Sequence, residues 1–187
     1  NKGVSYSLPE LSEFQKTTNR QISNYLGNDF EWFLYTPDKV TLYVKEVGEG
    51  ETLVVLHGGY GMTHNYMRGF MKSFEDKYHV VYYDQRGSTR SPVPDDDFEK
   101  YITMENMVND LELLRRELKV DKLRLIAHSM GAILAYEYMK KFPEHAGDII
   151  IISGHPPKLP ETNAEFFDAY TAKNNEAAYK EKQKERI

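Results

Sequence analysis

Residues 126–131 of this chain, IAHSMG, constrain its architecture more than any other segment. They follow an apolar, strand-like run and lead into a helical pattern over residues 132–141. Ala127 and Gly131 place a small residue two positions from Ser129 on each side, as in the strand-to-helix turn called a nucleophile elbow. Such a turn strains the serine backbone, and bulky neighbours would hold strand and helix apart. The segment therefore predicts an α/β protein with the Ser129 hydroxyl exposed above a sheet.

Two backbone amides are expected to form an oxyanion hole beside this serine. Met130 would begin the helix, where its N–H points at an anion. A second loop, HGGYG at residues 57–61, follows the apolar run 53–56, and its glycines let the backbone approach a substrate. We expect the amide of Gly59 to be the second donor. An ordinary glycine-rich turn is the alternative for this loop.

A third loop, DQRGSTRS at residues 84–91, follows the strand-like run 80–83. Open α/β sheets place their sites at the carboxyl ends of strands, so this loop should border the same pocket. Asp84 and Arg86 are expected to pair or to bond to the backbone, and so to hold the loop. A direct catalytic role for Asp84 is the less favoured alternative, because the acid of such a site follows the serine.

The order of the three motifs resembles the α/β-hydrolase superfamily. H-G-G-x-G followed by D-Q-R-G-S-x-R-S is similar, more narrowly, to the proline iminopeptidase group of S33 serine peptidases, over residues 30–157. Tyr60 stands where that group commonly has proline, and Ala127 where it commonly has glycine. The resemblance implies an α/β-hydrolase fold, with helices on both faces of a mostly parallel sheet. We expect an N-terminal arm at 1–29, the N-terminal part of the core at 30–157 and the beginning of a helical cap at 158–187.

The hydrophobic pattern agrees with this layout independently. Strands are expected at residues 30–36, 40–47, 53–56, 80–83, 123–127 and 148–152, and helices at 64–77, 104–118 and 132–141. Strands alternating with helices predict a mostly parallel sheet, and Thr103 is the expected N-cap of the second helix. The continuous apolar runs 53–56 and 149–152 predict strands that are buried on both faces. Residues 1–29 are expected to pack on the core as short helices or an arm.

The base and the acid that would activate the serine are expected outside this sequence. In this arrangement both follow the serine, and only His145 and His155 do so among the histidines. His145 is expected in a surface turn, and His155 could line the pocket but comes early for a base. We therefore expect that the C-terminal part of the fold is missing. A solvated helix that closes a small domain is the alternative for residues 158–187.

Besides His155, the candidates for lining the pocket belong to the loop at 57–61 and to the serine turn. They are His57, Gly58, Tyr60 and His128. The histidines next to the loops are expected to orient the backbone rather than to transfer protons. In a peptidase, carboxylates of the cap would select a free amine, and Glu161, Glu165 and Asp168 lie in the right region, although nothing assigns them.

Composition excludes several classes of function. A net charge of −5 gives no electrostatic reason to expect nucleic acid, and no apolar stretch nears the roughly 20 residues of a membrane span. The chain has no cysteine, which excludes a thiol nucleophile. His57 and His64 lack a third ligand at metal-binding spacing, so neither a metal nor a cofactor is expected. The compartment stays open: cytoplasmic, or exported or periplasmic if a signal peptide preceded Asn1.

The motifs predict a serine hydrolase that cleaves a small amide or ester through an acyl-enzyme at Ser129. The resemblance implies an aminopeptidase that acts on N-terminal residues of peptides, especially proline. An esterase or lactonase of the same fold is one alternative. A non-catalytic α/β-hydrolase-like domain that binds a ligand or a partner is another, because the base and the acid are absent from the sequence.

Overall fold

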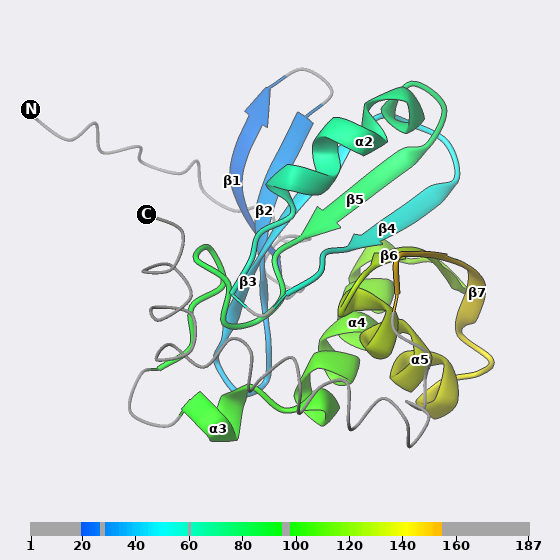
Figure 1. Cartoon of the computed structure of the whole chain (residues 1–187). Coiled ribbons are helices and arrows are strands. Elements are labelled where there is room, and N and C mark those ends of the chain that lie inside the picture. The colour runs from blue at the N-terminus through cyan, green and yellow to red at the C-terminus, as the bar shows by residue number, and fades with distance from the viewer. Residues whose placement is uncertain (1–19, 27–28, 60, 95–97, 155–187) are drawn as a thin grey trace, which may run out of the picture. The chain divides into compact units, whose positions relative to one another are not determined.

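The computed structural model describes residues 20–26, 29–59, 61–94 and 98–154, which form a seven-stranded sheet with helices on both faces (Figure 1). The strands are β1 (Arg20–Leu26), β2 (Asp29–Tyr35), β3 (Thr41–Val47), β4 (Thr52–Leu56), β5 (His79–Tyr83), β6 (Leu123–His128) and β7 (Ala146–Ile152). The helices are α2 (Asn65–Glu75), α3 (Phe98–Tyr101), α4 (Met104–Leu118) and α5 (Gly131–Lys141). The expected elements of the core are therefore confirmed, with ends that shift by a few residues.

The sheet has the order β1-β2-β3-β5-β4-β6-β7. Strands β5, β4, β6 and β7 run parallel to one another, while β1, β2 and β3 pair antiparallel at one side. Parallel neighbours need a crossover, and the helices supply it. The carboxyl ends of β4, β5 and β6 consequently meet at one edge of the sheet, where the three loops predicted to form the site begin.

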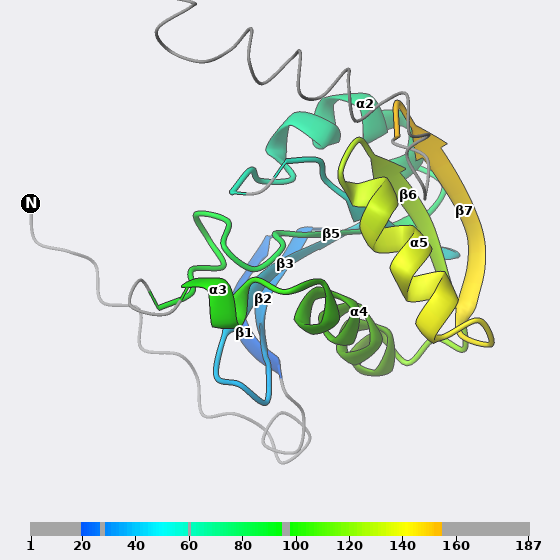
Figure 2. The ribbon, with the colours of Figure 1, turned by 60° about the horizontal axis from the view of Figure 1, so that its bottom comes forward.

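Two apolar layers fix the sheet between the helices (Figure 2). On one face, Met67 and Met71 of α2 pack against β4, β5 and β6. On the other face, α4 and α5 cover the sheet in a larger core that includes the fully buried Trp32. Alternate residues of β4 enter opposite layers, which confirms that the run 53–56 is buried on both faces.

Helix α4 begins and ends as its sequence predicts. The hydroxyl of Thr103 accepts a hydrogen bond from the Asn106 amide at 3.1 Å, which satisfies one of the orphan donors of the first turn. The apolar stripe places Leu111 and Leu114 in the core at zero exposure. The cap and the buried stripe therefore hold α4 in place next to the loop that follows β5.

Two expectations for the flanking segments were wrong. Ile150 and Ile152 are 53% and 41% exposed, because β7 lies at an edge of the described sheet and its side chains alternate between a covered and an open face. Residues 20–26, expected as helix or arm, form β1 and pair with β2. Residues 1–19 and 155–187 lie outside the described residues, so the cap and the domain boundaries stay predictions.

Candidate active site

Ser129 occupies a strained turn between β6 and α5. Its φ is +52°, in the left-handed region that costs a non-glycine residue about 1–3 kcal/mol. Backbone hydrogen bonds hold the turn: the Ser129 N–H donates to the Ile152 carbonyl at 3.1 Å, and the Ala132 N–H donates to the Ser129 carbonyl at 3.1 Å. The predicted strand-to-helix turn is therefore present with the backbone conformation that a nucleophile elbow requires.

Two glycines let the surrounding backbone close around this serine. A Cβ on Gly131 would lie 2.7 Å from the carbonyl oxygen of Leu56, and one on Gly58 would lie 2.7 Å from Cβ of Ser129. Both distances are shorter than side chains tolerate. Ala127 is completely buried, so the methyl that replaces the family's usual glycine is accommodated. The loop after β4 thus lies directly against the serine.

The amides expected to form the oxyanion hole flank this contact. Met130 is the N-cap of α5, and among the described residues no side chain caps that end. The Ala132 and Ile133 amides of the first turn donate to the Ser129 and Met130 carbonyls, so the Met130 amide stays the donor predicted to face an anion. Gly59 has a φ of +72° and is partly exposed in the loop after β4. The amide of Gly58 is already engaged, because it donates to the phenol oxygen of Tyr66 at 2.6 Å. Gly59 therefore stays the donor predicted for this loop.

His57 holds two loops together from a buried position. The ring is 1% exposed, and its Nε2 accepts a hydrogen bond from the Gln85 amide at 3.0 Å. The side chain of Gln85 donates in return to the His57 carbonyl at 2.7 Å. Burial lowers the pKa of His57, so the ring is neutral and carries its proton on Nδ1, 3.2 Å from the Gly58 carbonyl. His57 therefore orients loops, and its place among the pocket-lining candidates stays a prediction.

Asp84 and Arg86 do not pair with each other. Oδ1 of Asp84 accepts the backbone N–H of His64 at 2.8 Å and lies 2.7 Å from Nδ1 of the same residue. Burial alone would raise the pKa of Asp84, but the bonds from His64 outweigh it and lower that pKa. Arg90 approaches the other oxygen at 3.2 Å. These contacts commit the Asp84 carboxylate to the start of α2, as a loop-holding role requires.

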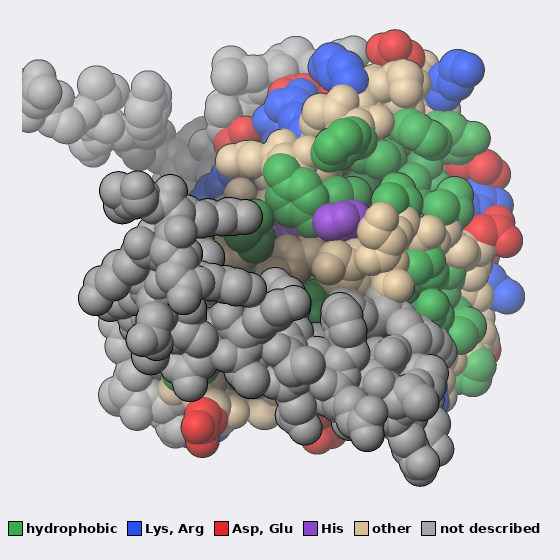
Figure 3. All heavy atoms as spheres, in the orientation of Figure 1, with side chains coloured by type: hydrophobic (Ala, Val, Ile, Leu, Met, Phe, Trp, Pro, Cys, Tyr) green, Lys and Arg blue, Asp and Glu red, His purple; other side chains and the backbone are tan. Residues whose placement is uncertain are grey.

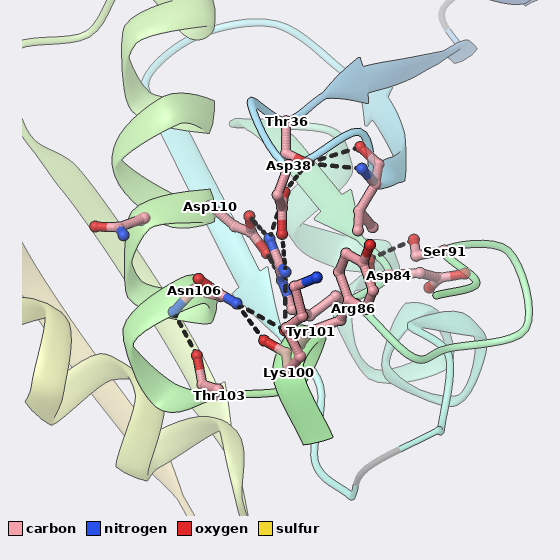
Figure 4. Close-up of polar contacts among 12 residues, drawn as sticks. Thr36, Asp38, Asp84, Arg86, Ser91, Lys100, Tyr101, Thr103, Asn106 and Asp110 are labelled. Carbon is pink, nitrogen blue, oxygen red and sulfur yellow. Dashed lines mark hydrogen bonds and ion pairs between the residues drawn. The ribbon is translucent and has the colours of Figure 1, made fainter. Parts of the chain in front are cut away.

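Arg86 ties the same loop to α4 and to the turn before β3 (Figure 4). Its guanidinium binds Asp110 through two bonds of 2.7 and 2.6 Å, Asp38 at 2.8 Å and the Tyr101 carbonyl at 2.8 Å. Burial raises the pKa of Asp110 to about 6 against the opposing effect of Arg86, so the pair is ionised at neutral pH. Sequence analysis identified the arginine but missed its partners, because no local pattern connects residues so distant in the chain.

His128 and Tyr66 meet beside the serine. The Tyr66 hydroxyl lies 2.8 Å from Nδ1 of His128, and the two rings pack edge to face at 5.5 Å. Sequence analysis missed Tyr66, whose position on an amphipathic helix predicted only packing. Hydrophobic side chains gather over the region of α2 (Figure 3). Phe70 of α2 is 75% exposed, and Met62, shortly before the helix, is 50% exposed.

Other candidates lie elsewhere or outside the described residues. Tyr60, His155 and the cap carboxylates Glu161, Glu165 and Asp168 belong to segments that the structure does not describe. His145 follows α5 in a turn and lies 3.2 Å from Glu112, as expected of a surface histidine. The described residues contain no group of three side chains suited to a metal, and none of their helices could span a membrane.

One cavity in the described part of the chain lies far from this chemistry. It measures about 590 Å³ and is lined by residues at the amino ends of β4, β6 and β7, the edge opposite Ser129. A second cavity of about 320 Å³ adjoins Arg86 and Asp38. Neither touches the elbow, so geometry around the serine, and not cavity size, defines the candidate active site.

Comparison with known proteins agrees with the fold. Residues 51–185 match the family model for the alpha/beta hydrolase fold, and the chain belongs to that family. Within it, the chain resembles the proline iminopeptidase group. Proline iminopeptidase of Lactobacillus acidophilus is 40% identical over 107 residues, which cover 56% of this chain and 36% of that protein. The enzyme of Lactobacillus delbrueckii subsp. bulgaricus is 34% identical over 145 residues, covering 74% and 49%.

Solved structures show the same similarity. A proline iminopeptidase-related protein from Thermus thermophilus shares 37% identity at a TM-score of 0.59, over 66% of this chain and 45% of that one. An epoxide hydrolase variant from Bacillus megaterium, at 22% identity and a TM-score of 0.55 over 65% of this chain and 42% of that one, shares the fold. The chain spans about half the length, or less, of the curated relatives it matches.

Proposed function

We propose that this chain carries the nucleophile and oxyanion hole of a serine hydrolase that cleaves a small amide or ester. The single observation that carries the proposal is the φ of +52° at Ser129, with Gly58 packed against the serine Cβ. Backbone strain of this kind is typical of functional sites, and a nucleophile elbow needs it to present the serine hydroxyl. Ser129 attacks the carbonyl carbon, and the amides of Met130 and Gly59 stabilise the oxyanion, each worth roughly 3 kcal/mol in comparable sites.

The histidine and the acid that complete such a site lie, in this proposal, outside the described residues. The buried histidines near the site support this division, because the rings of His57 and His64 are both committed to loop contacts. A base must reach the proton that it removes within a hydrogen bond, and a ring held in this way does not. The relatives named above extend well beyond the aligned part, which leaves room for both groups.

The resemblance to proline iminopeptidases directs the substrate toward peptides with an N-terminal proline. An esterase or lactonase of the same fold is the second candidate, since the elbow and the oxyanion amides serve any acyl transfer. Turnover of a prolyl amide, compared with turnover of a short acyl ester, separates the two. Preference for the prolyl amide that is lost when its amine is acetylated supports the peptidase.

The nucleophile is tested by labelling the full-length protein with a fluorophosphonate. The matched control is Ser153, an exposed serine directly after β7 that also has a positive φ, +46°. We expect Ser129→Ala to abolish labelling and Ser153→Ala to retain it. Absence of labelling at Ser129 in the intact protein would contradict the proposal and favour a non-catalytic binding domain.

A further inference from the structure

Tyr66 connects the two loops that build the candidate active site. Its phenol oxygen accepts the Gly58 N–H at 2.6 Å and lies 2.8 Å from Nδ1 of His128. Gly58 precedes the proposed oxyanion donor Gly59, and His128 precedes the proposed nucleophile Ser129. One hydroxyl group therefore contacts the neighbour of each reacting group, although these neighbours are 70 residues apart in sequence.

The chemistry of these contacts fixes the direction of the first hydrogen bond. A backbone N–H can only donate, so the phenol oxygen accepts from Gly58. The phenol can donate its own proton to Nδ1 of His128 in the tautomer that carries the ring proton on Nε2. The chain of bonds runs from Gly58 through Tyr66 to His128, and each donor in it has an acceptor.

Packing around the three residues restricts how far they can move. Gly58 is buried, and a Cβ placed on it would touch both Ser129 and the carbonyl of His128. The Tyr66 ring packs edge to face on His128, while its neighbours on α2, Met67 and Met71, are anchored under the sheet. Helix α2 thus holds the Tyr66 hydroxyl group in a fixed position next to the carboxyl ends of β4 and β6.

We propose that Tyr66 is a positioning residue that sets the oxyanion loop against the nucleophile. By occupying the Gly58 amide it directs Gly59, and not Gly58, toward the substrate, and by bonding His128 it fixes the loop relative to Ser129. This inference rests on the proposed serine hydrolase function. Loss of the phenol oxygen leaves the Gly58 amide without its acceptor and loosens both loops, while the ring still fills its place.

The test is Tyr66→Phe in the full-length protein, with Tyr78→Phe as the matched control. Tyr78 lies in the turn after α2, packs on Phe74 and has no part in the hydrogen bonds that join Gly58, Tyr66 and His128. We expect Tyr66→Phe to lower kcat and the rate of fluorophosphonate labelling about 10- to 100-fold with little change in KM, as for a small misplacement of a reacting group. Tyr78→Phe should match the wild-type protein in both measurements.

Amide exchange at Gly58, followed by NMR, separates the inference from the function on which it rests. We expect faster exchange in Tyr66→Phe, whether or not the protein hydrolyses a substrate. Faster exchange without labelling of the wild-type protein would overturn the hydrolase function alone. Labelling that is equally fast in wild type and variant would overturn the positioning role. Slower labelling with unchanged exchange would also overturn it, since Tyr66 would then act on the substrate directly.

The partner histidine gives a second, independent measurement. Asn places an acceptor near the position of Nδ1, whereas Leu removes it, so His128→Asn should lose less activity than His128→Leu. In a double-mutant cycle, Tyr66→Phe should cost much less in the His128→Leu background than in the wild type. Equal costs in the two backgrounds would contradict the proposed chain of hydrogen bonds.

Discussion

Arg86 and Asp110 form a buried, two-bond ion pair that joins the loop after β5 to helix α4. The bonds measure 2.7 Å from Nε and 2.6 Å from Nη2, and the two side chains are 2% and 3% exposed. Paired geometry of this kind fixes orientation as well as distance. The loop that borders the candidate active site is consequently anchored to α4.

Removal of one partner from this pair should be severely destabilising. Asp110→Asn leaves the buried guanidinium with less charge compensation, and we expect a loss of roughly 3–5 kcal/mol in the free energy of unfolding. Asp121→Asn, at an exposed position just after α4, is the control and should change little. Urea denaturation of both variants measures the difference. Similar midpoints for the two would mean that Asp38 alone suffices to hold Arg86.

Two glycine-to-alanine substitutions should change stability in opposite directions, one through a steric clash and the other through higher helix propensity. A Cβ on Gly131 would collide with the Leu56 carbonyl, so Gly131→Ala should lower both stability and serine labelling. Gly69, inside α2, has no atom within 4 Å of such a Cβ, and Gly69→Ala should raise stability by about 0.5–1 kcal/mol. Thermal unfolding of the two variants, with labelling, checks the opposite signs. A stable and reactive Gly131→Ala protein would contradict the packing described for the elbow.

Stability should fall below neutral pH in part because of His57. Burial lowers its pKa in the folded state, while the unfolded chain has the ordinary value of about 6.5. As the pH falls through 6.5, the unfolded state takes up a proton that the folded state resists, so the free energy of unfolding decreases. Above that pH the ring is neutral in both states and has no effect.

His57→Gln checks this dependence, because the glutamine oxygen can accept the Gln85 amide in place of Nε2. Urea midpoints measured at pH 7.5 and 5.5 should differ less in His57→Gln than in the wild type. Carboxylates contribute a background slope that is common to both proteins and cancels in the comparison. Equal pH dependence in the two proteins would show that His57 is protonated as easily when folded as when unfolded.

The sequence predicted the local features of this fold well. Thr103 caps α4, Ser129 lies in a left-handed turn, and the run 53–56 is buried on both faces, because each depends on neighbours within a few positions. Burial on both faces is the weaker of these inferences, because it also needs a covering layer that an apolar run does not reveal, and Ile150 and Ile152 lack that cover.

Long-range partners were beyond prediction for a different physical reason. Asp110 and Asp38 lie on α4 and on the turn before β3, and only the folded sheet brings them to Arg86. Tyr66 likewise had no sequence signal, because an apolar stripe on a helix accounts for its ring and leaves its hydroxyl unexplained. The substitutions that test the candidate site are therefore chosen mainly from long-range contacts, which only the folded structure reveals.

The parallel pairing of β4 with β6 places Leu56 opposite Ala127, one residue before the oxyanion loop and two before the serine. A strand advances about 3.3 Å per residue, so a slip of one position would separate the two loops by more than a hydrogen bond can span. If Ser129 is the nucleophile proposed above, its rate of labelling therefore measures whether β4 and β6 pair in the correct register. A misfolded protein with intact helices and a shifted sheet would have a native circular dichroism spectrum but would not be labelled at Ser129.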